Sequence, residues 1–201
     1  MGSDAGSFVV YEGVDGAGTT TQAMALVEAL KETGRSAIYT REPSDGPVGR
    51  YIREILRGKA RERVSEASLA ALFAADRLDH LDQEIQPALR EGFVVVCDRY
   101  LLSSMTYQGV MTGDRDWVAA LNSRAAQPDL TILLDVPHDE AARRRSQRPE
   151  DLERYEIDET QRAVAEAYRD LAAEAGALVL DGTRPREELT REIMHLLEEG
   201  T

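Results

Sequence analysis

The chain has 201 residues, of which 42% are hydrophobic and 30% charged, a length that suits one globular domain with a well-buried core and is short for two. Acidic residues outnumber basic ones by 37 to 24, and the formal charge of −13 argues against a broad surface for nucleic acids or anionic membranes. Cys97 is the single cysteine, which excludes an internal disulfide framework, and no apolar run approaches the roughly 18 residues of a membrane span. We therefore expect a cytoplasmic protein with one domain over residues 1–201, with neither nucleic acid nor membrane as a partner.

Short apolar runs alternate with longer helical patterns along the chain. This alternation is typical of a parallel β-sheet covered by helices. The five runs expected to form strands are residues 8–11, 37–40, 93–97, 130–136 and 177–180. Residues 1–7, which lack periodicity, are expected to be disordered. The predicted fold class is therefore α/β, with three layers and a five-stranded parallel sheet flanked by helices.

Two helical patterns separate the first three strands. The first ends at Gly34, a residue type that commonly stops a helix, and its apolar positions are Met24, Val27 and Leu30. The second is longer and is expected to end before Pro87. Its apolar positions are Leu69, Leu72, Phe73 and Leu78.

The stretch EGVDGAGTTTQ, residues 12–22, follows the first expected strand and precedes the first helix. It fits the phosphate-binding pattern G-x-x-x-x-G-K-[ST] except at Thr19, which stands where the pattern has lysine. A glycine-rich turn in this position surrounds an anion with backbone N–H groups and the positive end of a helix. The alternative is a purely structural turn. The candidate ATP- and phosphate-binding residues are Gly13, Gly16, Ala17, Gly18, Thr19, Thr20 and Thr21.

The third expected strand ends in Asp98 and Arg99. Ligands of open α/β sheets gather at the carboxyl ends of the strands, so this pair should lie beside the glycine-rich loop if the first and third strands are neighbours. Asp98 is then a candidate magnesium ligand, together with the Thr20 hydroxyl, and Arg99 is a candidate phosphate clamp. A surface ion pair at a strand end is the alternative.

These features belong to a longer series of segments. In chain order they are EGVDGAGTTTQ, TREP (40–43), LFAADRLDH (72–80), CDRYLLSSMTYQG (97–109), PDLTILLDVP (128–137) and ERYE (153–156). In their order and spacing they resemble the thymidylate kinase family, a group of P-loop nucleoside monophosphate kinases. The resemblance implies transfer of the γ-phosphoryl group of ATP to dTMP, giving dTDP for dTTP synthesis, with Mg²⁺ as cofactor. It also implies a homodimer and a mobile lid at about residues 143–156.

The resemblance also assigns the dTMP-binding residues. By this resemblance, Phe73 stacks on the thymine ring. Arg77, one helical turn later, donates a hydrogen bond to the base carbonyl. Spacing alone instead favours a core Phe73 and an Arg77 paired with a carboxylate. Arg41 and Arg99 match two arginines that grip the dTMP phosphate. His80, on the same helix, is expected to have no task of its own.

Further positions follow from the same resemblance. Asp15 corresponds to a carboxylate near the acceptor phosphate, its magnesium ion and the sugar 3′-hydroxyl, which makes it a catalytic, dTMP-binding and metal-binding candidate; capping the turn is its alternative role. Tyr107 matches the aromatic side chain that crowds the sugar 2′ position. Ser104 and Gln108 match positions near the base. Residues 181–183 match the segment that packs the ATP base.

The arginine-rich segment of residues 141–156 would be a solvated surface on composition alone. In the family that the chain resembles, it is the lid that carries arginines to the transferring phosphoryl group. Arg148 and Arg154 are the first catalytic candidates in it, followed by Arg144 and Arg145.

The missing lysine leaves two hypotheses open. In the first, a lid arginine or Arg99 supplies the charge that Thr19 lacks, and the enzyme is active. In the second, the protein is a weak or inactive nucleotide-binding protein that senses dTMP, dTTP or ATP. The intact set of acceptor-site residues favours the first hypothesis.

Overall fold

A computed structural model describes residues 6–61, 63–147, 155 and 158–199. The five expected strands are present, and their ends differ from the predictions by at most one residue. They form one parallel sheet in the order β2-β3-β1-β4-β5, which confirms the predicted α/β class. The strands are β1 (Ser7–Glu12), β2 (Ala37–Arg41), β3 (Val94–Asp98), β4 (Leu130–Asp135) and β5 (Leu178–Asp181).

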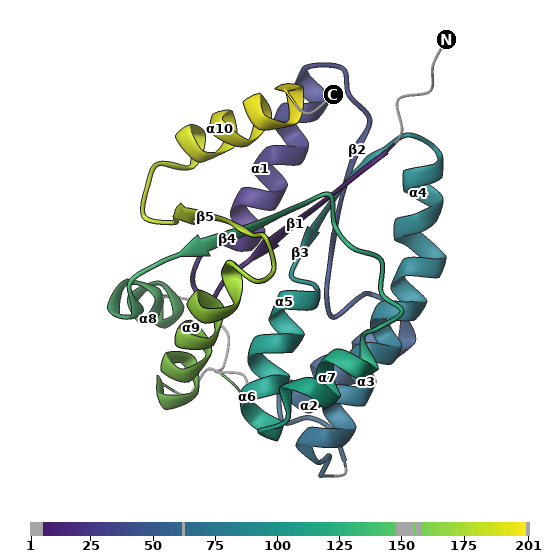
Figure 1. The fold of residues 1–201 in the computed structure, drawn as a ribbon, viewed down its shortest axis with the longest axis vertical. Coiled ribbons are helices and arrows are strands. Elements are labelled where there is room, and N and C mark those ends of the chain that lie inside the picture. Colours follow the sequence, from purple (N-terminus) through teal and green to yellow (C-terminus); the bar gives the residue numbers. More distant parts are fainter. Residues whose placement is uncertain (1–5, 62, 148–154, 156–157, 200–201) are drawn as a thin grey trace.

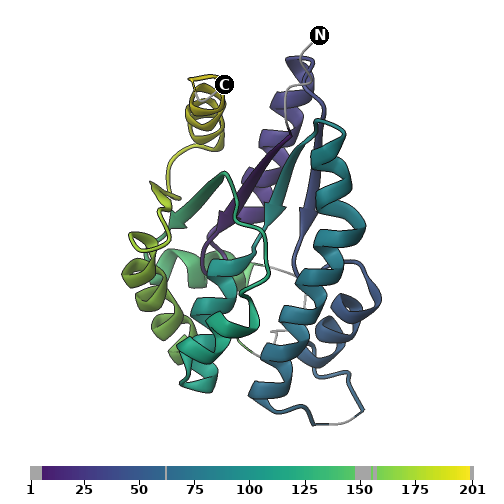
Figure 2. The same cartoon turned by 45° about the vertical axis from the view of Figure 1, so that its right-hand side comes forward.

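Helices connect the strands and cover both faces of the sheet (Figures 1 and 2). The segments before β3 are α1 (Thr19–Glu32), α2 (Pro47–Leu56), α3 (Glu66–His80), the π-helical turn η1 (Leu81–Ile85) and α4 (Gln86–Arg90). Those between β3 and β4 are α5 (Leu101–Ser103), the π-helical turn η2 (Ser104–Gln108), α6 (Gly109–Thr112) and α7 (Arg115–Leu121). The last are α8 (His138–Ser146), α9 (Asp158–Ala172) and α10 (Arg186–Glu199).

The central strand β1 is buried on both faces, because its alternate side chains point to opposite sides of the sheet. Val9 and Tyr11 join the core that contains buried side chains of α1, α9 and α10. Phe8 and Val10 join a second core that contains Leu81 and other residues near η1. In Figure 1, α1 and α10 lie side by side, and in Figure 2, α3, η1 and α4 form one long rod on the other side of the sheet. The result is a three-layer architecture.

Three expectations about the elements need correction. Ser7, expected to be disordered, opens β1 because its backbone pairs with Val94. Met24 is 49% exposed, since the buried stripe of α1 runs through Ala23, Leu26, Val27 and Leu30 instead. The second helix does not stop before Pro87 but continues through η1 into α4. Pro87 lies in the first turn of α4, where its missing N–H group breaks no required hydrogen bond.

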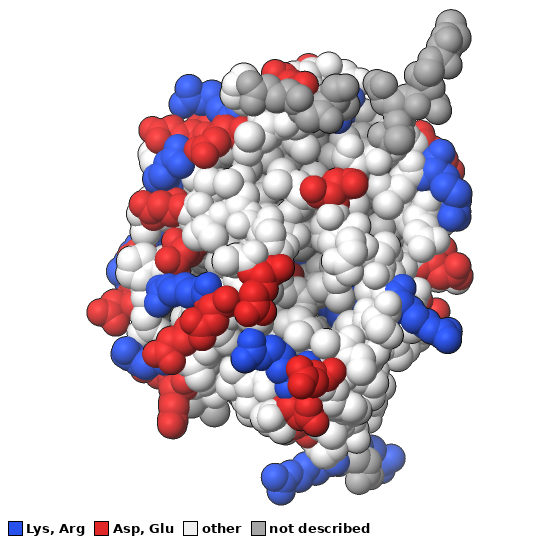
Figure 3. Space-filling model, viewed as in Figure 1, with Lys and Arg blue, Asp and Glu red and all other residues white. Residues whose placement is uncertain are grey.

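The arginine-rich segment begins in a helix, because α8 extends to Ser146. Residues 143–146 of the expected lid are therefore helical, whereas Arg148 and Arg154 lie outside the described residues. On the face seen in Figure 3, acidic and basic side chains are interspersed, with uncharged surface between them. None of the described helices is long and apolar enough to cross a membrane.

Candidate active site

The glycine-rich loop joins the end of β1 to the start of α1 and lies at the carboxyl edge of the sheet. Gly18 caps α1 with φ of 95°, and Gly16 has φ of 93°, a left-handed conformation that favours glycine. A Cβ atom on Gly16 would also lie 2.4 Å from the backbone oxygen of Ala141 in α8. The loop therefore presents its backbone and the positive end of α1 to one small region, as the sequence predicts.

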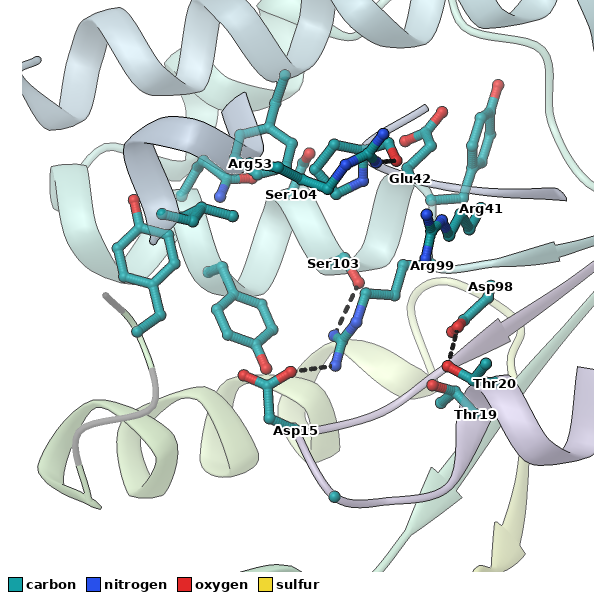
Figure 4. Close-up of a pocket in the computed structure, with 18 of the residues that line it drawn as sticks. Asp15, Thr19, Thr20, Arg41, Glu42, Arg53, Asp98, Arg99, Ser103 and Ser104 are labelled. Carbon is teal, nitrogen blue, oxygen red and sulfur yellow. Dashed lines mark hydrogen bonds and ion pairs between the residues drawn. The ribbon is translucent and has the colours of Figure 1, made fainter. Parts of the chain in front are cut away.

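Strands β1 and β3 are neighbours, with Tyr11 in register with Asp98. This pairing brings the end of β3 beside the loop, as expected. The Thr20 hydroxyl donates a hydrogen bond to Oδ2 of Asp98 (Figure 4). Oδ1 of Asp98 is buried and has no hydrogen-bond partner in the described part of the chain. A buried carboxylate oxygen without a partner is costly unless a ligand satisfies it.

The Thr20 and Asp98 oxygens fit the requirements of Mg²⁺, which prefers hard oxygen ligands and is commonly held by one or two carboxylates together with substrate phosphates. Within the described residues, no group of three or more His, Cys, Asp or Glu side chains forms a metal site. Asp15, the third expected ligand, points to Arg99 instead of the Thr20–Asp98 pair (Figure 4). The structure thus brings together two of the three expected ligands.

Arg99 lies at the centre of the site (Figure 4). Its Nη2 atom is 2.6 Å from Oδ1 of Asp15, and its Nη1 atom donates to the backbone oxygen of Gly13 at 2.8 Å. The guanidinium carbon lies 5.3 Å from the centre of the Tyr107 ring. Among the described residues, Arg99 is the one non-glycine residue with positive φ, at 72°, a conformation that persists when its surroundings hold it.

Glu12 helps to hold the turn after β3, in which Arg99 lies, and the sequence interpretation missed this role. Its side chain is fully buried and accepts hydrogen bonds from the backbone N–H groups of Tyr100 (3.0 Å) and Ser103 (3.1 Å). The hydroxyls of Ser103 (2.5 Å) and Tyr168 (3.1 Å) also donate to it. Burial raises the pKa of Glu12, and the hydrogen bonds from Ser103 oppose that rise. An acidic residue directly after an apolar strand was the available signal.

The substitution Glu12→Gln tests whether these hydrogen bonds to Glu12 hold the turn after β3 in place. The amide would direct N–H groups toward donors that the carboxylate now accepts from, so we expect a loss of about 1–3 kcal/mol in the free energy of unfolding. Urea denaturation measures the loss, with exposed Glu32→Gln as the matched control, which should change stability by less than about 0.5 kcal/mol. Equal stability of the two variants would show that Glu12 does not anchor the turn after β3.

Gln161 of α9 is a second residue that sequence reasoning missed. Its Nε2 atom donates to Oδ2 of Asp15 at 2.7 Å, and its Oε1 atom accepts from the Asp15 backbone N–H at 3.2 Å. Both carboxylate oxygens of Asp15 are therefore engaged, one by Arg99 and one by Gln161. No sequence signal pointed to this contact, since Gln161 reads as an ordinary polar residue of a helix.

One cavity of about 420 Å³ connects the loop with the expected acceptor site, a volume within the range of small-molecule sites. All eight expected dTMP-binding residues line it: Asp15, Arg41, Phe73, Arg77, Arg99, Ser104, Tyr107 and Gln108. Its wall also contains Gly16, Gly18, Thr19, Thr20, Thr21 and Asp98, whereas Gly13 and Ala17 are not part of it. Residues far apart in the sequence are thus brought together.

Arg77 combines the two roles that the sequence left open. It lines the cavity, yet it is only 1% exposed and pairs with Glu42, whose Oε2 atom lies 2.6 Å from Nη2. It also donates to the backbone oxygen of Tyr100, to Ser104 and to Asn122. The carboxylate pairing expected from spacing alone is therefore present. Phe73 is half-buried at the edge of the core and lines the same cavity.

His80 is more involved than expected. It is buried, with Nδ1 at 3.4 Å from Oε1 of Glu42 and Nε2 at 2.7 Å from the Thr40 hydroxyl. Burial alone would lower the pKa of His80, but hydrogen bonds to Glu42 and Glu84 raise it to about 9. The imidazole is therefore charged at neutral pH and donates from both ring nitrogens.

Two arginines of α8 contact the glycine-rich loop. Arg145 is buried, lines the cavity and donates from Nη1 to the backbone oxygen of Asp15 at 2.7 Å. Arg144 donates to the backbone oxygens of Ala17 (3.3 Å) and Gly182 (3.1 Å), the latter within the expected adenine segment. The sequence ranked both behind Arg148 and Arg154, which lie outside the described residues. The parallel sheet, the glycine-rich loop at its carboxyl edge and the arginines that α8 brings to that loop are typical of one class of protein. They define a nucleotide-binding protein of the P-loop α/β class.

Comparisons with known proteins agree with this class. The family model described as thymidylate kinase matches residues 11–193. The chain is 45% identical over 170 residues to the probable thymidylate kinase of Pyrococcus abyssi, with 83% of each chain covered. It is 42% identical over 194 residues to the probable thymidylate kinase of Pyrobaculum aerophilum, with 96% of each covered. The thymidylate kinase of Symbiobacterium thermophilum is 38% identical over 198 residues, which cover 96% of this chain and 92% of that one. The chain belongs to the thymidylate kinase family and is therefore an enzyme, a nucleotide-binding kinase.

Proposed function

We propose that this protein transfers the γ-phosphoryl group of ATP to dTMP, giving ADP and dTDP, and so supplies dTTP synthesis. One observation carries the proposal: a single cavity joins the phosphate-binding loop to the residues expected to bind dTMP. A donor phosphate on the loop and an acceptor nucleotide in the cavity would therefore meet beside Arg99.

The acceptor nucleotide would be held at its base and at its phosphate. Phe73 offers an aromatic face for stacking on thymine. Arg41 and Arg99 offer two guanidinium forks to the monophosphate, which accepts paired N–H donors. The side chain of Arg41 is 48% exposed and pairs with Asp45 at 3.2 Å, and a surface ion pair of this kind is exchanged for a phosphate at little cost.

The other acceptor-site residues would orient the sugar and the base. Tyr107 is buried against Arg99 and would crowd the sugar 2′ position, which favours a deoxyribose. Ser104 and Gln108 would lie near the base. Asp15, held between Arg99 and Gln161, would orient the sugar 3′-hydroxyl and the acceptor phosphate. In-line phosphoryl transfer depends chiefly on such positioning.

The donor side would use the loop backbone and the start of α1 to hold the ATP phosphates. Thr20 and Asp98 would hold Mg²⁺, which when bound neutralises charge on the donor phosphates. Thr19 contributes no positive charge there. Arg145 enters the same cavity from α8, and we assign to it the charge that the loop lacks.

The hypothesis of an inactive nucleotide sensor receives no support from the comparisons. The relatives are named as kinases or probable kinases, and the cavity is lined by the expected acceptor residues and by Arg145 of α8. A homodimer remains a prediction of the family resemblance, and a cytoplasmic location remains a prediction of the sequence composition. Light scattering of the purified protein would determine the oligomeric state.

The reaction is tested by incubating purified protein with ATP, Mg²⁺ and a panel of dTMP, dUMP, dGMP and dCMP, and by separating the nucleoside diphosphates formed. We expect dTDP as the main product and its loss when excess EDTA is present. Tight dTMP binding without turnover would overturn the proposed reaction. Efficient phosphorylation of dGMP would overturn the assignments of Phe73 and Arg77.

A further inference from the structure

At the wall of the acceptor cavity, three buried side chains form a chain from Arg77 through Glu42, which both line the cavity, to His80, which does not. Their exposed fractions are 1%, 6% and 3%. Nε and Nη2 of Arg77 both donate to the same Glu42 oxygen, Oε2, at 2.9 and 2.6 Å. The other oxygen, Oε1, faces Nδ1 of His80 at 3.4 Å. Each oxygen of the carboxylate thus has its own cationic partner.

Because the two oxygens of Glu42 have different partners, the orientation of the Arg77 guanidinium is restricted. A guanidinium beside an unrestrained carboxylate prefers the two-oxygen fork, whereas here His80 engages the second oxygen. The guanidinium lies 5.0 Å from the centre of the Tyr100 ring and donates once from Nη1, to Asn122. Arginine has five N–H groups, so one N–H of Nη1 has no partner among the described residues. Arg77 lines the cavity, so this N–H is the donor that it has left for a ligand.

Buried ion pairs are weak contributors to stability, because desolvation offsets most of the attraction between the charges. Three buried ionic side chains in a row therefore point to a role in geometry more than in stability. The chain also continues to β2, since Nε2 of His80 lies 2.7 Å from the Thr40 hydroxyl, beside Arg41. The imidazole thereby joins the base end of the cavity to the strand that carries the phosphate-binding arginine.

We propose that His80 is a positioning residue of the acceptor pocket, which holds Glu42 so that Glu42 keeps the Arg77 guanidinium directed toward the base of the acceptor nucleotide. His80 touches no substrate and acts through Glu42. The inference rests on the proposed function, because it takes the dTMP base as the ligand of Arg77.

Two near-isosteric replacements separate the contacts of the two ring nitrogens. The amide nitrogen of asparagine stands in for Nδ1, so His80→Asn keeps a donor toward Glu42. The amide nitrogen of glutamine stands in for Nε2, so His80→Gln keeps a donor toward Thr40 and loses the one toward Glu42. For His80→Gln we expect the KM for dTMP and the Kd of dTMP from calorimetry to rise about tenfold. The kcat at saturating dTMP and the KM for ATP should stay within about twofold of wild type, because the donor site is unaffected.

The asparagine variant is the matched control, and its dTMP affinity should stay within about threefold of wild type. Equal dTMP affinity in wild type and His80→Gln, or equal losses in both variants, would overturn the positioning role. So would a fall in melting temperature with parallel changes for dTMP and ATP, which indicates a purely structural role. If either variant does not fold, Glu42→Gln, which weakens the contact with Nδ1 of His80 and leaves Thr40 in place, should still raise the KM for dTMP selectively, and an unchanged KM would count against the proposal. A wild-type protein that neither binds nor phosphorylates dTMP would instead overturn the proposed function and this inference with it.

Discussion

Replacing Arg99 with methionine is expected to lower kcat for dTMP phosphorylation by about two to three orders of magnitude, the usual effect of removing one preorganised donor from a transferring group. The KM for dTMP should rise as well, since Arg99 is one of two arginines assigned to the acceptor phosphate. The variant also removes the 2.6 Å contact with Asp15 and the hydrogen bond to the Gly13 oxygen. Steady-state kinetics with dTMP and ATP varied separately would measure both effects.

Two control variants separate these effects. Arg99→Lys keeps the charge but loses the planar fork, so it should recover only part of the activity. Arg169→Met removes an arginine that pairs with Asp135 at the surface, with both side chains more than 40% exposed, and it should leave the kinetics unchanged. If Arg99→Met retained wild-type kcat and KM, the clamp assignment would be wrong.

The fold was predictable because its signals are local. Apolar runs of strand length and helical periodicity located all five strands to within one residue. The rule that ligands gather at the carboxyl ends of parallel strands then placed Asp98 and Arg99 beside the loop. The continuation of the helix past Pro87 was missed because a proline is compatible with a helix only when the turn before it is adapted, here by η1.

Site residues could be predicted where the residue type and its motif indicate the chemistry. They could not be predicted where the role depends on a contact between residues far apart in the sequence. Gln161 lies 146 positions from Asp15 in the sequence, and no pattern connects them. Glu12 and His80 were overlooked for another reason: their roles depend on burial and on partners that only the packed structure defines. The sequence also ranked the arginines of residues 141–156 by motif position, whereas two that it ranked lower, Arg144 and Arg145, contact the loop directly.

The contact between Arg145 and the loop leads to the second prediction of a large effect, a loss of activity in Arg145→Met. Phosphoryl transfer requires positive charge near the donor oxygens, and Thr19 offers a hydroxyl at most. Arg145 is 6% exposed, lines the cavity and touches the backbone of Asp15, so its charge acts in a site with little solvent screening. We expect kcat to fall by about two to three orders of magnitude, with the KM for dTMP changed little, because the acceptor residues stay in place.

The matched control is Arg143→Met, two residues earlier in α8, since Arg143 is 57% exposed and pairs with Glu140. It should leave kcat unchanged. Thr19→Lys, added to Arg145→Met, should restore a large part of the lost activity if both side chains supply the same charge, and should add little to a wild-type enzyme that already has Arg145. Arg148→Met and Arg154→Met test the two arginines that the sequence ranked first as the source of this charge. A large loss of kcat in either of these two, with Arg145→Met near wild type, would move the compensating charge from α8 to the segment that follows it.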